Sequence, residues 1–402
     1  MTGTQAQAQT QVQTQAQTRP RLVTARFVAL GLAALAYFFA EGLLVPAVPR
    51  YVAGPLRAGD VAVGVAVGAF NLTALVLRPW AGRLADRRGR VGLMVIGAAI
   101  YGLSVAAYGL ADDVAVLVAL RLLTGVGEAF FFVATLTAMS DLAPAERRGE
   151  AMSLFSLSLY AGLAIGPPVG EAMAGALGFT AVWMLAAGAA GAGIVLAIRV
   201  GDTRADGQVP AGGTRQRLIP AAAVVPGLLM LAAIWGMAVY LAFVPLYVAD
   251  LGLHSSGVLM FLFAGIVVMV RSIGARLPDR LGAHRAVRLA LAGIAAGLVI
   301  IGGWPSIAGL VAGTVVLGLG VALATPAIFV LALDGVPQNE RGAVLGAVSM
   351  SIDVAFGLGP VVFGLVAAGA GREAGFLVAA GVAGAGLLLA ARRAQPAEDS
   401  RI

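Results

Sequence analysis

Apolar runs long enough to cross a lipid bilayer follow one another along almost the whole chain of 402 residues. A bilayer core about 30 Å thick needs roughly 20 apolar residues of helix for each crossing. Lipid offers the backbone no hydrogen-bond partner, so only helices or closed barrels can span it. These runs are too long and too uniformly apolar for barrel strands, which alternate in segments of about ten residues. The sequence therefore predicts an all-α membrane protein.

The composition excludes several other classes of protein. Hydrophobic residues make up 60% of the chain and charged residues 12%, whereas about a quarter of the residues in soluble domains are charged. The basic residues behind the net charge of +7 form short clusters between apolar runs, which indicates membrane orientation rather than nucleic-acid binding. The chain has no cysteine, two histidines (His254 and His284) and no phosphate-binding Gly-Lys-Ser/Thr loop. We therefore expect no disulfide, no metal, no cofactor and no ATP-driven pumping by this chain alone.

Polar breaks divide the apolar sequence into twelve predicted transmembrane helices. They span residues 27–48, 61–80, 91–111, 114–140, 150–176, 178–199, 220–248, 256–275, 286–304, 306–333, 342–369 and 373–391. Arginines concentrate in the connections after helices 2, 4, 6, 8 and 10 and are fewer in the opposite connections. Because cytoplasmic loops carry the excess of basic residues, we predict a multi-pass protein of the cell membrane with both termini in the cytoplasm.

The longest polar interruption divides the chain into two halves. Residues 201–217 are rich in Gly, Asp, Arg and Thr and fall midway, which is typical of a cytoplasmic linker. A Gln/Thr/Ala repeat without apolar periodicity opens the chain, so residues 1–23 are predicted to be a disordered cytoplasmic tail. We accordingly predict six-helix bundles at 24–200 and 218–393 and a second cytoplasmic tail at 394–402.

Many residues recur at one fixed spacing. Asp279 lies 193 residues after Asp86, and Arg271 lies 193 residues after Arg78. The same spacing relates Gly89 to Gly282, Gly125 to Gly318, Gly127 to Gly320, Asp141 to Asp334, Pro144 to Pro337, Arg148-Gly149 to Arg341-Gly342, and Gly166-Pro167 to Gly359-Pro360. This single register predicts two pseudo-symmetric six-helix bundles related by a parallel repeat, which is the arrangement of a transporter that rocks about a central site.

Several motifs resemble those of the major facilitator superfamily. The loop from Gly82 to Arg90 is similar to the family's signature loop between helices 2 and 3, and residues 275–282 are similar to its counterpart between helices 8 and 9. The segment from Arg121 to Gly127 resembles the helix 4 motif, in which a buried Arg precedes close-packed glycines. The resemblance covers the chain from residue 24 onward and implies the major facilitator fold.

The fifth helix carries a further motif. Gly162, Gly166, Pro167 and Gly170 resemble the motif of the twelve-helix drug/proton antiporter branch. The chain departs from that motif at Glu171, where a second Gly is usual. The resemblance implies an exporter of the antiporter type.

Residues present in both halves are interpreted as scaffold. We predict a cytoplasmic latch formed by Gly82, Asp86, Arg87, Gly89, Asp279, Arg280, Arg78 and Arg271. An Asp at a helix start can accept backbone N–H bonds and pair with Arg, and glycines allow the backbones to approach closely. The alternative is that the basic loops only set topology and that Arg78 and Arg271 are anchors that reach toward the interface.

Ionisable residues that break the repeat are candidates for proton coupling. They are Asp353, Glu128, Glu41 and Arg121, all deep in predicted helices where an ionisable group is costly unless it faces a functional cavity. Asp353 lies about 16 Å from the start of its predicted helix, close to the bilayer midplane. Carboxylates that contact Arg121 alternately could take up a proton on one side and release it on the other. The alternative is a static buried ion pair. Glu171, another residue that breaks the repeat, is predicted to be exposed near the outer surface.

Aromatic residues, one Asn and one Met are the candidates for the wall of a substrate cavity, because such surfaces suit bulky, partly apolar ligands. They are Tyr37, Phe38, Phe39, Asn71, Phe130, Phe131, Phe132, Tyr160, Trp235, Tyr240, Phe243 and Met260. The other interpretation of each is ordinary helix packing.

These features predict a secondary active transporter that exports a small amphipathic or cationic compound in exchange for protons by alternating access. Its expected partners are that small molecule, protons and the lipid bilayer, and we expect a monomer without nucleic acid. The alternatives are a metabolite uptake symporter or uniporter and a non-transporting membrane sensor. An enzyme is not expected, because no nucleophile, base or metal-ligand set converges in the sequence.

Overall fold

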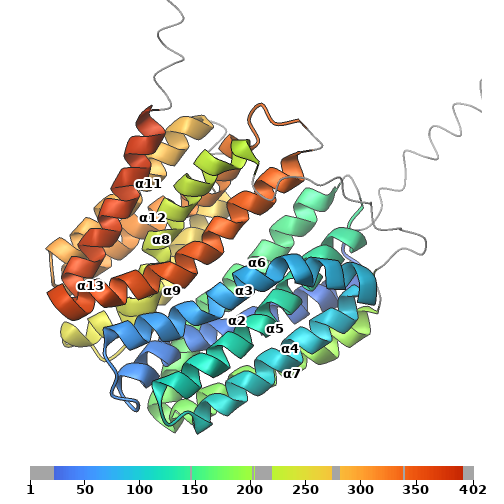
Figure 1. The fold of residues 1–402 in the computed structure, drawn as a ribbon, viewed down its shortest axis with the longest axis horizontal. Coiled ribbons are helices and arrows are strands. Elements are labelled where there is room, and N and C mark those ends of the chain that lie inside the picture. Colours follow the sequence, from blue (N-terminus) through green and yellow to red (C-terminus); the bar gives the residue numbers. More distant parts are fainter. Residues whose placement is uncertain are drawn as a thin grey trace, which may run out of the picture.

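Every regular element among the described residues is a helix (Figure 1). The computed structural model describes residues 22–144, 147–201, 203, 220–273, 281–337 and 340–392. The first half contains α2 (Ala25–Ala53), α3 (Asp60–Arg88), α4 (Arg90–Ala106) with the 3-10 helix η1 (Ala107–Leu110), α5 (Val114–Leu142), α6 (Arg148–Leu177) and α7 (Phe179–Val200). The second half contains α8 (Ala221–Asp250), α9 (Gly257–Ile273), α11 (Ala283–Gly303), α12 (Ile307–Ala332) and α13 (Arg341–Arg392).

Some predicted features fall outside this description. They are the N-terminal tail up to residue 21, most of the linker at 201–217, the C-terminal tail, and the latch residues Asp279 and Arg280. The backbone of Asp86 is described, but its side chain is not. The domain boundaries, the two tails and the part of the latch that involves these residues remain predictions.

The helices have the lengths that membrane crossings require. Ten of the described helices are long and apolar enough to cross a membrane, and Gly257–Ser272 forms a shorter apolar helix. The 52-residue helix α13 contains a break at Gly371, where φ is 86° and ψ is 163°. Glycine reaches positive φ without a steric penalty, so α13 consists of two arms close to the two predicted helices there. The all-helical membrane fold is confirmed, and the exact number of twelve crossings remains a prediction.

Helix ends follow from local chemistry at equivalent places in the two halves. The Asp113 side chain accepts a hydrogen bond from the Val116 N–H at 2.8 Å and so caps the start of α5. Gly89 and Gly282 adopt φ values of 94° and 77°. Because residues with a side chain rarely adopt these angles, the two glycines allow α3 to turn directly into α4 and allow α11 to begin.

Helix packing repeats at the spacing seen in the sequence. A Cβ added to Gly127 would lie 2.6 Å from the Gly97 carbonyl oxygen, and one added to Gly320 would lie 2.8 Å from the Ala290 carbonyl oxygen. Gly97 and Ala290 are themselves 193 residues apart. The pairs α4/α5 and α11/α12 therefore pack backbone to backbone at matching positions, as two pseudo-symmetric bundles should.

The glycines of the helix 5 motif pack α6 against α2. A Cβ added to Gly166 would lie 2.6 Å from the Gly42 Cα, and one added to Gly170 would lie 2.4 Å from the Leu43 carbonyl oxygen. Small residues let membrane helices approach this closely. The motif thus brings the outer part of α6 against α2 and positions the residues that follow it.

The two halves meet along α3 and α13, which run side by side in the centre of Figure 1, and along α6 and α9. A Cβ added to Gly64 would lie 2.2 Å from the Pro360 carbonyl oxygen, and one added to Gly68 would lie 2.1 Å from the Gly357 carbonyl oxygen. The α3/α13 seam is therefore closed by backbone contact over its outer part.

Candidate functional site

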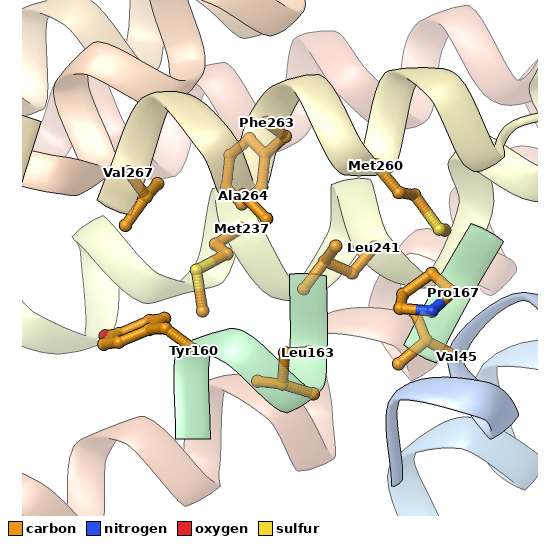
Figure 2. Close-up of a pocket in the computed structure, with 10 residues that line it drawn as sticks. All are labelled: Val45, Tyr160, Leu163, Pro167, Met237, Leu241, Met260, Phe263, Ala264 and Val267. Atoms are coloured by element: carbon orange, nitrogen blue, oxygen red, sulfur yellow. The ribbon is translucent and has the colours of Figure 1, made fainter. Parts of the chain in front are cut away.

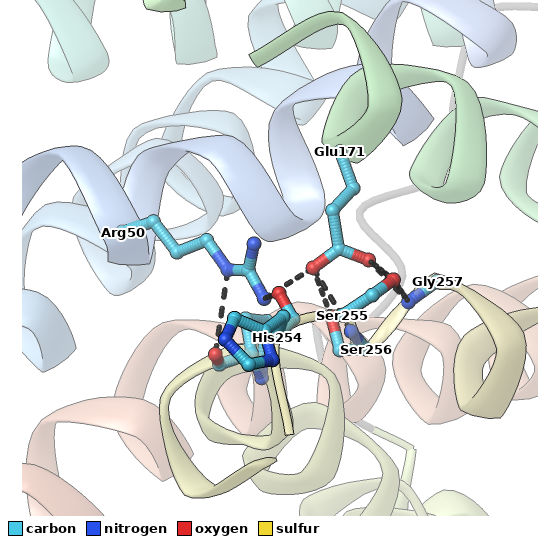
Figure 3. A network of polar contacts seen from close by, with 7 residues as sticks. Arg50, Glu171, His254, Ser255, Ser256 and Gly257 are labelled. Carbon is cyan, nitrogen blue, oxygen red and sulfur yellow. Dashed lines mark hydrogen bonds and ion pairs between the residues drawn. The ribbon is translucent and has the colours of Figure 1, made fainter. Parts of the chain in front are cut away.

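Glu171 connects the two halves at one end of the molecule, called the outer end after the predicted orientation (Figure 3). Its carboxylate accepts hydrogen bonds from the Ser255 hydroxyl at 2.7 Å, from the Ser256 N–H at 2.9 Å, and from the Gly257 N–H. A carboxylate suits the start of a helix, where N–H groups lack partners within the helix. The prediction that Glu171 is exposed is wrong, because the start of α9 covers it and leaves it 7% exposed.

Arg50 extends this contact to α2. It forms an ion pair with Glu171, and its guanidinium donates to the carbonyl oxygens of Pro245 at 3.4 Å and His254 at 3.3 Å. Figure 3 shows Arg50 and Glu171 converging on the loop between α8 and α9 from two helices of the first half. We call Arg50, Glu171 and residues 254–257 the outer clasp.

A second polar contact closes the outer end beside the break in α13. Arg372 follows Gly371 and pairs with Asp60 at the start of α3, at 2.8 Å, and with Asp250 at the end of α8, at 2.7 Å. Asp60 belongs to the first half, whereas Arg372 and Asp250 belong to the second. The outer end is therefore held closed by polar contacts at two places.

An ion pair also joins the halves deep inside the molecule. The guanidinium of Arg78 on α3 lies 2.8 Å from the carboxylate of Asp353 on α13, which is 3% exposed. It is a single-point contact without hydrogen-bond geometry, since the Nε of Arg78 and the Oδ2 of Asp353 lack hydrogen-bond partners among the described residues. The Arg78 guanidinium also lies 4.5 Å from the Phe132 ring centroid.

On the other seam, Arg271 of α9 lies over Tyr160 of α6. The guanidinium carbon is 4.3 Å from the ring centroid, a cation–π contact between the halves. The Nε of Arg271 is buried and has no hydrogen-bond partner among the described residues. Arg78 and Arg271, which were predicted to belong to a latch, thus both lie between the halves.

Arg121 and Glu128 lie on the same helix, α5, and are both buried. Arg121 donates to the backbone carbonyls of Ala66 at 2.9 Å and Val67 at 3.1 Å on α3. Glu128 has one carboxylate oxygen without a hydrogen-bond partner among the described residues. Glu41 on α2 is half-buried, and its charge interacts with that of Glu128. The predicted exchange of contacts between Arg121 and the carboxylates remains a prediction, since Arg121 binds backbone carbonyls in this state.

A narrow apolar cavity of about 40 Å³ lies between the halves (Figure 2). Its walls come from α2, α6, α8 and α9 and consist of Val45, Tyr160, Leu163, Pro167, Met237, Leu241, Met260, Phe263, Ala264 and Val267. Tyr160 and Val267 lie at one end of it in Figure 2, and Met260, Pro167 and Val45 lie at the other. We call this space the interhalf cavity.

Two of the residues predicted to line a substrate cavity, Tyr160 and Met260, line the interhalf cavity. Tyr37 and Phe131 instead stack on each other within the first half, with centroids 3.9 Å apart, and Phe243 packs on Phe363 within the second. A cavity role remains a prediction for these and for the other candidates, Phe38, Phe39, Asn71, Phe130, Phe132, Trp235 and Tyr240.

Sequence reasoning missed Met237, Leu163 and Phe263 as cavity residues. Each is an apolar residue within an apolar helix, and composition does not distinguish a cavity wall from a packed interface. Leu163 lies on α6, Phe263 on α9 and Met237 on α8. Identifying them as wall residues requires knowing how these helices pack across the two halves.

Comparison with known proteins places these features in a family. The model of the Major Facilitator Superfamily matches residues 30–307 and 273–402. An uncharacterised transporter of that type from Salmonella typhimurium is 28% identical over 354 residues, which cover 85% of this chain and 89% of the relative. Multidrug resistance protein 2 of Bacillus subtilis is 33% identical over 138 residues, which cover 34% of each chain.

The fold has solved counterparts. A bacterial homolog of the human lysosomal transporter Spinster, in an inward-facing and unoccupied conformation, has a TM-score of 0.75 at 16% identity. The match covers 93% of this chain and 98% of the solved chain.

Proposed function

Because the chain belongs to the major facilitator superfamily, we propose that it is a proton-coupled exporter of a small amphipathic compound. It works by alternating access, in which the two halves rock about the space between them. Its partners are the transported compound and protons, and it acts as a monomer in the cell membrane with both termini in the cytoplasm.

The observation that carries this proposal is the buried ion pair between Arg78 and Asp353. It joins α3 of one half to α13 of the other. Protonation of Asp353 would remove its negative charge and with it the electrostatic attraction to Arg78, one of the contacts between these helices. Proton uptake would thus be linked to a change in the relative stability of the two states, which is the thermodynamic requirement for coupling.

Glu128 and Glu41 supply a second place for the proton. Both are on helices of the first half, and the charges that act on Glu128 include those of Arg78 and Asp353. A proton could therefore be exchanged between sites whose charges influence one another. One carboxylate oxygen of Glu128 has no hydrogen-bond partner among the described residues, so it is available to accept a proton.

Export as the direction rests on the helix 5 motif and on the partial match to a multidrug resistance protein. The second candidate is uptake of a metabolite by symport or uniport. The deep carboxylates favour a proton-coupled mechanism over a uniporter, because burial of ionisable groups in a membrane is costly unless they are used.

The test is transport by purified protein in proteoliposomes with an imposed pH gradient and a panel of amphipathic anions, cations and neutral compounds. We expect Asp353→Asn, Glu128→Gln and Glu41→Gln to reduce flux driven by the pH gradient. Glu150→Gln is the matched control, because Glu150 is exposed and pairs with Arg147 at the surface. Undiminished pH-driven flux in the variant that combines all three substitutions would refute the coupling mechanism.

A further inference from the structure

The two interhalf arginines occupy equivalent positions, and so do their partners. Arg271 lies 193 residues after Arg78, and Asp353 lies 193 residues after Tyr160. The contact between Arg78 and Asp353 therefore has a structural copy in the contact between Arg271 and Tyr160. The fold builds the same pair twice, once with a carboxylate and once with a neutral phenol.

Among the described residues Arg271 forms no ion pair, whereas its equivalent, Arg78, pairs with Asp353. The charge of Arg78 acts on Asp353, Glu128 and Glu41. The cation–π contact with Tyr160 compensates only part of the lost hydration of a guanidinium. A cation placed within a membrane protein without an acidic partner is costly and indicates a functional role.

The same contact places Arg271 at one end of the interhalf cavity. Tyr160 lines that cavity, and Arg271 follows Val267, another wall residue, by one turn of α9. The remaining wall is apolar and includes the side chains of Met237 and Met260. The site thus combines a positive group at one end with an apolar slot of adaptable Met and aromatic side chains.

We propose that the transported compound is an amphipathic organic anion, whose anionic group pairs with Arg271 and whose apolar part enters the interhalf cavity beside Tyr160. The planar guanidinium suits carboxylate, sulfonate or phosphate groups, which it can bind with two parallel hydrogen bonds. A cationic compound would meet repulsion there. The inference deepens the proposed transport function and rests on it, and it selects the anionic class of amphipathic compound.

The size of the cavity limits what this state can hold. A space of about 40 Å³ exceeds the 10–15 Å³ that one water needs but holds only a few non-hydrogen atoms. With the outer end closed, the cavity therefore accommodates the edge of an apolar ring or the end of a chain. Full occupancy requires the α6/α9 seam to separate further.

The experiment measures binding of two probes with the same ring and opposite permanent charge, 2-naphthalenesulfonate and (2-naphthylmethyl)trimethylammonium. Radiolabelled probes are bound to the full-length protein in lipid nanodiscs at equilibrium. We expect the wild type to prefer the sulfonate and Arg271→Gln to weaken sulfonate binding by at least about tenfold, as loss of one partner of a buried charge pair does. Arg271→Lys keeps the charge but loses the planar pair of donors, so its affinity for the sulfonate should lie between those of the wild type and Arg271→Gln.

A second pair of variants keeps Arg271 and tests whether its positive charge must be unpaired for the sulfonate to bind. Tyr160→Asp gives Arg271 a carboxylate partner of the kind that Arg78 has in Asp353. Tyr160→Asn is its control, because Asn has nearly the same shape as Asp but no charge. The sulfonate should bind Tyr160→Asp at least about tenfold more weakly than Tyr160→Asn. Thermal melting of each variant shows whether it is folded.

The outcomes separate this inference from the proposed function. Preference of the wild type for the ammonium probe, absence of saturable sulfonate binding, or equal sulfonate affinity of wild type and Arg271→Gln would each overturn it. Binding that depends on Arg271 without any flux in proteoliposomes would support the anion site and refute transport. Flux that is insensitive to Arg271→Gln would refute the anion site alone.

Discussion

At the scale of single residues, the contact between Arg78 and Asp353 is expected to control stability as well as coupling. Arg78→Gln would leave a buried carboxylate without its charge partner, at a cost of roughly 2–5 kcal/mol. Asp353→Asn in the same chain should restore most of the stability, because no unpaired charge remains. Thermal melting of the two single variants and the double variant measures this interaction as a double-mutant cycle. Strictly additive losses would show that the two side chains do not interact.

The burial of Glu171 could not be predicted from the sequence. Its position near the outer end of α6 was predictable from the length of the helix, but its burial was not. The groups that bury it, Ser255, Ser256 and Gly257, belong to the other half of the chain and lie more than eighty residues away. The residue pattern around one position does not predict contacts with residues so distant in the sequence.

At the scale of helices, the close approach of α4 and α5 depends on the absence of a side chain at Gly127. Gly127→Ala should destabilise the protein by roughly 1–3 kcal/mol, because the new methyl group would lie 2.6 Å from a backbone oxygen and 2.7 Å from a backbone nitrogen. Gly320→Ala should have a similar effect through α11 and α12. Gly188→Ala on α7 is the control, since its Cβ would meet nothing within 4 Å. Melting temperatures in detergent compare the three variants, and equal melting of Gly127→Ala and Gly188→Ala would contradict the packing argument.

The outer clasp links α6 to the start of α9, so its loss should loosen the outer end. Glu171→Gln removes the charge that attracts Arg50 and the helix N-terminus. The chain has no cysteine, so Met260→Cys alone provides a reporter at the outer end of the interhalf cavity. We expect a membrane-impermeant maleimide, added from outside, to label it faster when Glu171→Gln is also present.

Glu150→Gln is the matched control for this labelling, because Glu150 lies at the opposite end of α6. It should leave the rate unchanged. Equal labelling of Met260→Cys with and without Glu171→Gln would mean that the outer clasp does not hold this end closed.

At the scale of the whole molecule, the fold was accessible from the sequence because it is built twice. The spacing of 193 residues predicted equivalent positions such as Gly127 and Gly320, and the structure places both in matching backbone contacts. The candidate site was accessible only in part. Deep charges such as Asp353 stand out in apolar helices, but their partners do not. Identifying Arg78 as the partner of Asp353 requires knowing that α3 and α13 lie side by side. That arrangement depends on how the two halves pack together, and neither helix alone predicts it.

The docking of the halves leads to the last prediction, which concerns the balance between two global states. The outer clasp and the pair between Arg372 and Asp60 both stabilise closure of the outer end. Combining Glu171→Gln with Arg372→Gln should therefore shift the population toward an outward-open state. Each 1.4 kcal/mol by which the closed state is destabilised changes the ratio of open to closed molecules about tenfold. Spin labels at Leu110→Cys and Val258→Cys, both 76% exposed at the outer ends of different halves, report the distance by double electron–electron resonance. Longer distances in the double variant are expected, and an unchanged distribution would show that backbone contact along α3 and α13 is sufficient to keep the outer end closed.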